Sequence, residues 1–127
     1  MKNSKEKVLK VLERAKERIQ NESNWVQVTL YDRDNNQFCL LGSLLPERSI
    51  KKLKNDKEYD PDLLYRTFRN CNSPSCDAVN LIAKELGGQG YELVYVFNDN
   101  TSHEEVIEVL DKTINNLKEQ IEQKHNK

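Results

Sequence analysis

Five side chains of this sequence are of the types that a cysteine-dependent hydrolase brings together: Cys39, His103, Asp99, Asn98 and Gln27. Such an enzyme needs a thiolate nucleophile, an imidazole base, a group that orients the base, and a donor that stabilises the oxyanion. Cys39 would supply the thiolate and His103 the base. The carboxylate and the two amides are of the types that fill the other two roles.

The surroundings of these residues favour a structural role over catalysis. Cys39 lies within the apolar run of residues 38–45, and unpaired cysteine is among the most buried residue types. Asn98 and Asp99 have the composition of a turn, and His103 falls in a capping turn, where a polar residue is expected anyway. We therefore predict no catalytic residue, and we keep a hydrolase that uses Cys39 and His103 as the alternative.

A second group of candidate residues is basic and lies in the middle of the chain. Residues 48–69 carry seven cations: Arg48, Lys51, Lys52, Lys54, Lys57, Arg66 and Arg69. Such a surface suits phosphates, but a single-strand binder also needs interleaved aromatic rings, which are few here. We take Arg48, Lys51, Lys52 and Lys54 as the candidate binding residues. Weak nucleic-acid binding through 48–69 is a second alternative function, and nucleic acid is not the expected partner.

The remaining cysteines do not complete a metal site. Cys71 and Cys76 are separated by four residues, whereas structural zinc needs four nitrogen or sulfur ligands, usually in two close pairs. Cys39, His103 and His125 do not supply the second pair. We predict no metal, no cofactor and two unpaired thiols, with a disulfide between Cys71 and Cys76 as the alternative.

The composition indicates one globular domain without a dominant charge. The chain has 127 residues, with 20 Lys or Arg against 21 Asp or Glu, and a net charge of −1. This balance excludes a strongly basic coat for nucleic acid as a property of the whole chain. We predict a single domain over residues 1–127, with an ordered core at about 5–121 and a frayed tail at 122–127.

The cellular location expected from the sequence is the cytoplasm. The first twenty residues contain no unbroken apolar stretch of the kind found in secretory signals. The longest apolar runs are far shorter than the ~20 residues that span a bilayer, so no membrane contact is expected. An odd number of cysteines, three in all, suits a reducing compartment.

The pattern of apolar residues predicts an α+β fold. We expect a small, mainly antiparallel sheet from residues 25–31, 36–40 and 91–97, packed against N- and C-terminal amphipathic helices. Residues 39–45 could equally open a buried helix, because periodicity does not distinguish the two in so short a run. Further helices are expected from Pro61 to Phe68 and from Pro74 or Ser75 to Leu86, with Gly87 as the stop.

The last helix has the clearest signals of the sequence. Ser102 and Glu105 have the spacing of a capping box at its start. Its apolar stripe consists of Ile107, Leu110, Ile114, Leu117 and Ile121. This stripe suits docking on the domain's own core, but its alternating spacing is also that of a short heptad seam, so a homodimer through the last helix is an alternative.

Three motifs resemble a family of small uncharacterised bacterial and phage proteins, a domain of unknown function. They are Trp25-x-Gln27, then Cys39-x-x-Gly42-Ser43-Leu44, and then Asn98-Asp99 followed by Ser102-His103-x-Glu105-Val106. The resemblance spans roughly residues 8–117. The family often has Gly where this chain has Val28, Ala where it has Ser43, and Trp where it has Phe97.

These observations together predict a small cytosolic binding or adaptor protein without catalysis. Its partner is expected to be a protein whose identity the sequence does not reveal. The resemblance implies that a phage or another mobile element encodes it.

Overall fold

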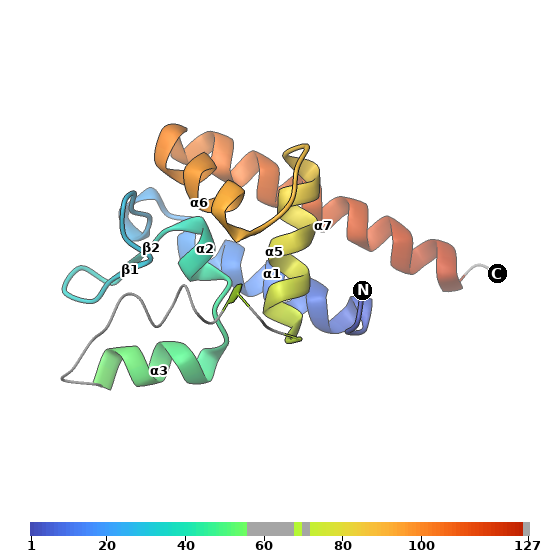
Figure 1. The fold of residues 1–127 in the computed structure, drawn as a ribbon, viewed down its shortest axis with the longest axis horizontal. Helices are drawn as coiled ribbons and strands as arrows, with labels where there is room; N and C mark the ends of the chain where they lie inside the picture. The colour runs from blue at the N-terminus through green and yellow to red at the C-terminus, as the bar shows by residue number, and fades with distance from the viewer. Residues whose placement is uncertain (56–67, 70–71, 126–127) are drawn as a thin grey trace.

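The computed structural model describes residues 1–55, 68–69 and 72–125, and Figure 1 shows their arrangement. The helices are α1 (Lys5–Ile19), α2 (Leu40–Ser43), α3 (Glu47–Asn55), α5 (Pro74–Glu85), α6 (Tyr91–Asn100) and α7 (His103–His125), with a 3-10 turn η1 (Glu22–Asn24). Two short strands, β1 (Tyr31–Asp32) and β2 (Gln37–Phe38), form an antiparallel sheet. The expected α+β class with a small antiparallel sheet is confirmed.

The two terminal helices pack against each other and carry much of the core, as their apolar stripes predict. Helix α1 begins at Ser4, whose hydroxyl accepts a hydrogen bond from the amide of Lys7 at 3.3 Å. It packs on both α5 and α7. The apolar stripe of α1 is buried and consists of Val8, Leu12, Ala15 and Ile19. Of the stripe predicted for α7, Leu110, Ile114 and Leu117 are buried, while Ile107 and Ile121 are partly buried.

The predicted hairpin exists but is shorter than expected. Tyr31 pairs with Phe38 and Asp32 with Gln37, and the two aromatic rings stack with centroids 4.6 Å apart. The Asp32 carboxylate accepts hydrogen bonds from the Asn35 side chain and from nearby backbone amides of the turn. These bonds hold the pKa of Asp32 below its ordinary value, with the Asn35 side chain as the largest cause.

The prediction of a strand over residues 25–31 is mostly wrong, because only Tyr31 lies in a strand. Trp25 makes one isolated bridge with Phe38, and residues 26–30 are irregular. The backbone of Val28 bonds to side chains of α6 instead of to a neighbouring strand. Its φ of 77° lies in the left-handed region, which a β-strand does not use.

The apolar run 39–45 takes the helical alternative. Helix α2 begins after Cys39, and all four of its residues are buried. A Cβ atom at Gly42 would collide with the carbonyl oxygen of Leu30, so a glycine is needed where α2 crosses the preceding loop. Residues 39–40 of the expected second strand therefore belong to the start of this helix.

The prediction of a strand at 91–97 is also wrong, because this segment lies in helix α6. Its tyrosines, valines and phenylalanine favour strands when they are considered locally. Val94 and Asn98 are nevertheless the two buried residues of the segment, and a spacing of four places them on one face of a helix. Tertiary packing thus decides the conformation against the local propensity.

Two cysteine predictions have different outcomes. Cys39 is a free and buried thiol, whereas Cys76 is disulfide-bonded, so the expectation of an unpaired thiol at Cys76 is wrong. Cys71 lies outside the described residues, as does most of the helix expected from Pro61. Helix α5 and its terminating Gly87, whose φ is 85°, occur as predicted.

Helix α7 continues past its apolar stripe to His125, and its C-terminal half projects beyond the rest of the fold in Figure 1. In the part of the chain that the structure describes, no helix has the length and apolar character that crossing a membrane requires.

Candidate functional site

The Asn98 side chain is the centre of the network that the sequence motifs form. It is fully buried near the end of α6. Its Oδ1 accepts hydrogen bonds from Trp25 Nε1 at 2.6 Å and from the Leu40 amide at 2.9 Å, and its Nδ2 donates to the Val26 carbonyl at 3.1 Å. Asn98 therefore joins α6, the start of α2 and the loop after η1.

Gln27 and Asp99 hold the same loop from its other side. Gln27 Nε2 donates to the carbonyl oxygens of Asn98 and Thr101, at 3.2 and 2.9 Å. Asp99 Oδ1 accepts from the Val28 amide at 2.8 Å and from Asn98 Nδ2 at 3.3 Å. Gln27 thus bonds to backbone carbonyls, and Asp99 Oδ1 bonds to a backbone amide and to the Asn98 side chain, which is a structural use.

The Cys39 thiol caps the N-terminus of α2. Its Sγ accepts a hydrogen bond from the Gly42 amide at 3.3 Å, the contact that an N-cap side chain makes. The residue is 0% exposed. Burial raises the pKa of the Cys39 thiol from 9.0 to about 12, with a minor contribution from the charge of Asp99. A thiol with this pKa is protonated at neutral pH and is a poor nucleophile.

His103 is turned toward the end of α1. Its Nε2 lies 2.6 Å from the carbonyl oxygen of Ile19. A carbonyl oxygen only accepts, so Nε2 carries a proton in this contact and is no base there. The ring also lies against Trp25, with centroids 5.5 Å apart and a tilt of 54°. Trp25 itself is partly buried and packs against the core.

The structure therefore brings the motif residues into one region but does not arrange them as a catalytic site. Asn98, Asp99 and Gln27 share one hydrogen-bond network, whereas Cys39 Sγ and His103 Nε2 bond to two different backbone groups. Across the described residues, every buried side-chain nitrogen or oxygen has a hydrogen-bond partner. Nor do three or more His, Cys, Asp or Glu side chains within that part of the chain form a group that could hold a metal ion.

The basic candidates lie together on helix α3. Arg48, Lys51, Lys52 and Lys54 are exposed, while Ile50 and Leu53 face the core. Within the described ranges, none of the four cations forms an ion pair, in contrast to Lys16, Arg18, Lys112 and Lys118. We call these four exposed side chains the α3 basic face.

One residue that the sequence did not single out fixes the start of α3. Arg18 of α1 donates two hydrogen bonds of 2.8 Å to the carbonyl oxygens of Ser43 and Leu45, at the end of α2. Its other nitrogen pairs with Glu47 at 2.8 Å and holds the pKa of that carboxyl below its ordinary value. In the sequence Arg18 is one of many charged residues of α1, and nothing marks it as a link between three helices.

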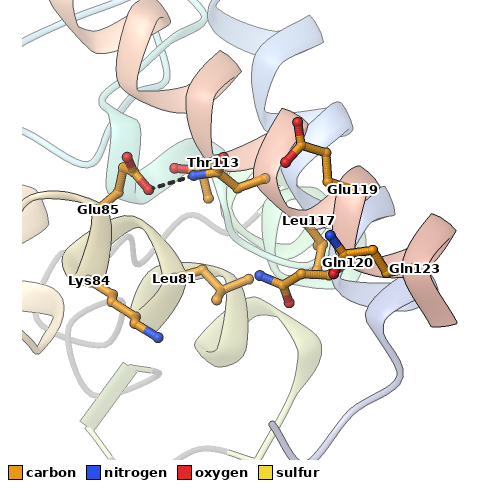
Figure 2. Close-up of a pocket in the computed structure, with 9 residues that line it drawn as sticks. Leu81, Lys84, Glu85, Thr113, Leu117, Glu119, Gln120 and Gln123 are labelled. Carbon is orange, nitrogen blue, oxygen red and sulfur yellow. Dashed lines mark hydrogen bonds between the residues drawn. The ribbon is translucent and has the colours of Figure 1, made fainter.

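A groove of about 360 Å³ lies away from the motif network, between α5 and the C-terminal half of α7 (Figure 2). It is lined by Leu81, Lys84, Glu85, Thr113, Asn116, Leu117, Glu119, Gln120 and Gln123. Glu85 already pairs with Lys112 at 3.1 Å and accepts a hydrogen bond from Asn116 at 2.9 Å. The polar groups of the groove are thus partly committed to joining the two helices.

The chain belongs to a family of unknown function, DUF6197, whose model matches residues 3–116. No curated protein and no solved structure matches it. The family membership confirms the expected domain of unknown function, and the matched range includes the motif network and α3, but the family assigns no activity to either.

Proposed function

We propose that this chain is a non-catalytic binding or adaptor protein, and that the α3 basic face contacts an acidic segment of a protein partner. The observation that carries the proposal is a contrast within the structure. The motif side chains are committed to internal hydrogen bonds, whereas the four cations of α3 are exposed and unpaired among the described residues.

The size and setting of the α3 basic face favour an acidic protein segment over nucleic acid. The four cations occupy less than two turns of one helix, and the whole chain has a net charge of −1. Specific nucleic-acid interfaces bury on the order of 1,000 Å² or more of protein surface and draw on a wider positive field. A short acidic helix or loop can be bound by a few cations that are spaced to meet its carboxylates.

The alternative of a cysteine-dependent hydrolase lacks support in this geometry. A nucleophilic thiol needs a lowered pKa and access for a substrate. The Cys39 thiol is buried, its pKa is raised to about 12, and it accepts a hydrogen bond from Gly42. The only described contact of His103 Nε2 is with a carbonyl oxygen rather than with sulfur.

We further propose a cytoplasmic protein of phage or mobile-element origin, on the strength of the motif resemblance to bacterial and phage proteins. A cytoplasmic location requires that the disulfide of Cys76 is reduced in the cell. Acid trapping of cells that express the protein, followed by thiol alkylation and mass spectrometry, measures this directly. An oxidised Cys76 in freshly trapped cells would contradict the cytoplasmic location.

The proposed partner surface is tested by quantitative affinity capture from the native host. The bait variant replaces Arg48, Lys51, Lys52 and Lys54 with glutamine. A matched control replaces Lys2, Lys5, Lys7 and Lys10 with glutamine, so that both baits lose four positive charges, one bait from α3 and the other from the N-terminal segment. We expect an acidic protein that the wild type and the control retain and the α3 variant loses.

Two outcomes would overturn the proposal. Equal capture by both variants would show that α3 is a solvated surface. Loss of the captured material after nuclease treatment, with no protein that binds directly, would favour nucleic-acid binding instead.

A further inference from the structure

Val28 combines two unfavourable features at one exposed position. Its φ of 77° is in the left-handed region, where a β-branched side chain is strained. The same side chain is 74% exposed, so burial of its methyl groups does not offset the strain. A strained conformation that packing does not explain is often kept for a function.

The fold holds Val28 in this conformation from both sides. Its amide donates to Asp99 Oδ1 at 2.8 Å, and its carbonyl oxygen accepts from the Tyr95 hydroxyl at 2.9 Å. The neighbouring Gln27 is tied to the end of α6 by two further hydrogen bonds. The valine is therefore presented on a fixed backbone rather than on a loose loop.

Helix α6, to which the backbone of Val28 is bonded, carries a second exposed valine and two carboxylates. Val96 is 53% exposed and is one of three large hydrophobic residues in the described ranges that are mostly open to solvent. Glu92 precedes it by four residues and Asp99 follows it by three, and such spacings place side chains on one side of a helix. Since Asp99 bonds directly to the backbone of Val28, the two valines and the two carboxylates share one surface.

We propose that Val28 and Val96 form a contact site for a peptide segment of a partner in which apolar side chains are flanked by cations. The valines would receive the apolar side chains, and Glu92 and Asp99 would attract the cations. This site is distinct from the α3 basic face and does not depend on the function proposed for it.

Charge complementarity selects this occupant over a second copy of the same surface. In a two-fold dimer through this surface, Glu92 and Asp99 of one copy would approach the same carboxylates of the other, and like charges repel. A cationic segment avoids that repulsion.

The test titrates the full chain, labelled at its valine methyl groups, with two synthetic peptides in NMR at low salt. One peptide is acetyl-Lys-Lys-Leu-Leu-Lys-Lys-amide, and the other replaces every lysine with glutamate. We expect the cationic peptide to shift the methyl signals of Val28 and Val96, and the acidic peptide to leave them unchanged. Larger shifts of the Val106 and Val109 methyl signals, on the acidic helix α7, than of the Val28 and Val96 signals would overturn the proposal, as would an equal response to both peptides.

The variant Val28→Gly separates a contact role from a structural one. Glycine relieves the backbone strain, so the variant should unfold at a higher urea concentration. It should also bind the cationic peptide about tenfold more weakly, a factor that corresponds to about 1.4 kcal/mol. Val96→Thr keeps the side-chain shape and should weaken binding in the same direction, whereas the four-residue glutamine variant of α3 should bind at least as well as the wild type. Unchanged affinity in both valine variants would contradict the inference.

Discussion

The motif network and the α3 basic face are both rich in polar side chains, but they use them in opposite ways. The buried Asn98 side chain uses both of its polar atoms in hydrogen bonds to the Trp25 indole and to the backbone of Leu40 and Val26. On α3, the four cations are exposed and form no ion pair within the described part of the chain, while Ile50 and Leu53 face the core and Glu47 pairs with Arg18. Polar residues that form a motif are thus not necessarily the residues that meet a partner.

This difference has an energetic consequence. Removing a buried hydrogen-bonding group leaves its former partners unsatisfied, which costs more free energy than the bond itself contributed. Removing an exposed unpaired charge leaves nothing unsatisfied and changes stability little. Substitutions in the motif network should therefore lower the free energy of unfolding much more than substitutions on the α3 basic face.

The largest effect is expected for Asn98→Ala. The substitution leaves the Trp25 indole, the Leu40 amide and the Val26 carbonyl without their partner, and the combined cost should be about 3–5 kcal/mol. Urea unfolding measures it. Asn100→Ala is the control, because that exposed amide makes a single bond to the Val96 carbonyl and should cost about 1 kcal/mol or less. Equal losses in the two variants would remove the distinction between network and surface.

A smaller effect is expected at Cys39. Cys39→Ala removes the cap of α2 and should cost about 1–2 kcal/mol, whereas Cys39→Ser retains an acceptor for the Gly42 amide and should cost less. Burial raises the pKa of the wild-type thiol from 9.0 to about 12. The stabilisation that the buried, protonated thiol gives to the folded state is therefore complete below pH 9.0 and is lost as the pH rises toward about 12. The stability difference between wild type and Cys39→Ala should therefore narrow over that range. A larger loss in the serine variant would contradict the capping role.

Trp25→Phe should lower the free energy of unfolding by about 1 kcal/mol. Phenylalanine keeps an aromatic ring against His103 but loses the indole donor to Asn98 Oδ1. Asn98 Oδ1 still accepts from the Leu40 amide, so it is not left without a partner. Chemical denaturation followed by circular dichroism measures the change without relying on tryptophan fluorescence. A variant as stable as the wild type would show that the indole bond adds nothing to the network.

The smallest effect on stability is expected when the α3 basic face is neutralised. Replacing Arg48, Lys51, Lys52 and Lys54 with glutamine should change the free energy of unfolding by no more than about 0.5 kcal/mol per site, and relief of like-charge repulsion favours a gain. The same urea titration measures it. A loss comparable with that of Asn98→Ala would mean that these cations support the fold and would weaken their assignment to a partner.

The parts of the fold that followed from the sequence are those in which local pattern and packing agree. The stripes of α1 and α7 repeat at helical spacing, and Ser102 accepts the Glu105 amide at 3.2 Å as the capping motif predicts. The Asp32 turn follows from the ability of Asp and Asn to bond their own backbone.

The remaining features depend on contacts between distant segments. Residues 91–97 have the composition of a strand, but they form a helix whose buried residues are Val94 and Asn98. The hydrophobic pattern does not reveal a buried asparagine. In the candidate site, the sequence located the motif residues and favoured a structural Cys39, but it interpreted Asn98 as a turn residue and missed Arg18, because their partners lie 25 to 73 positions away.

The most direct test of the structural role of the motif residues is the reactivity of Cys39 in the native protein. After reduction of the disulfide, the folded chain is treated with iodoacetamide between pH 6 and 9, and each cysteine is quantified by mass spectrometry. We expect Cys39 to be alkylated far more slowly than Cys71 or Cys76, and to react at a comparable rate only in urea, because its thiol is buried and its pKa is about 12. Fastest alkylation at Cys39 in the folded state, with a midpoint below about pH 7 that His103→Ala abolishes, would contradict this structural role and establish a reactive thiol.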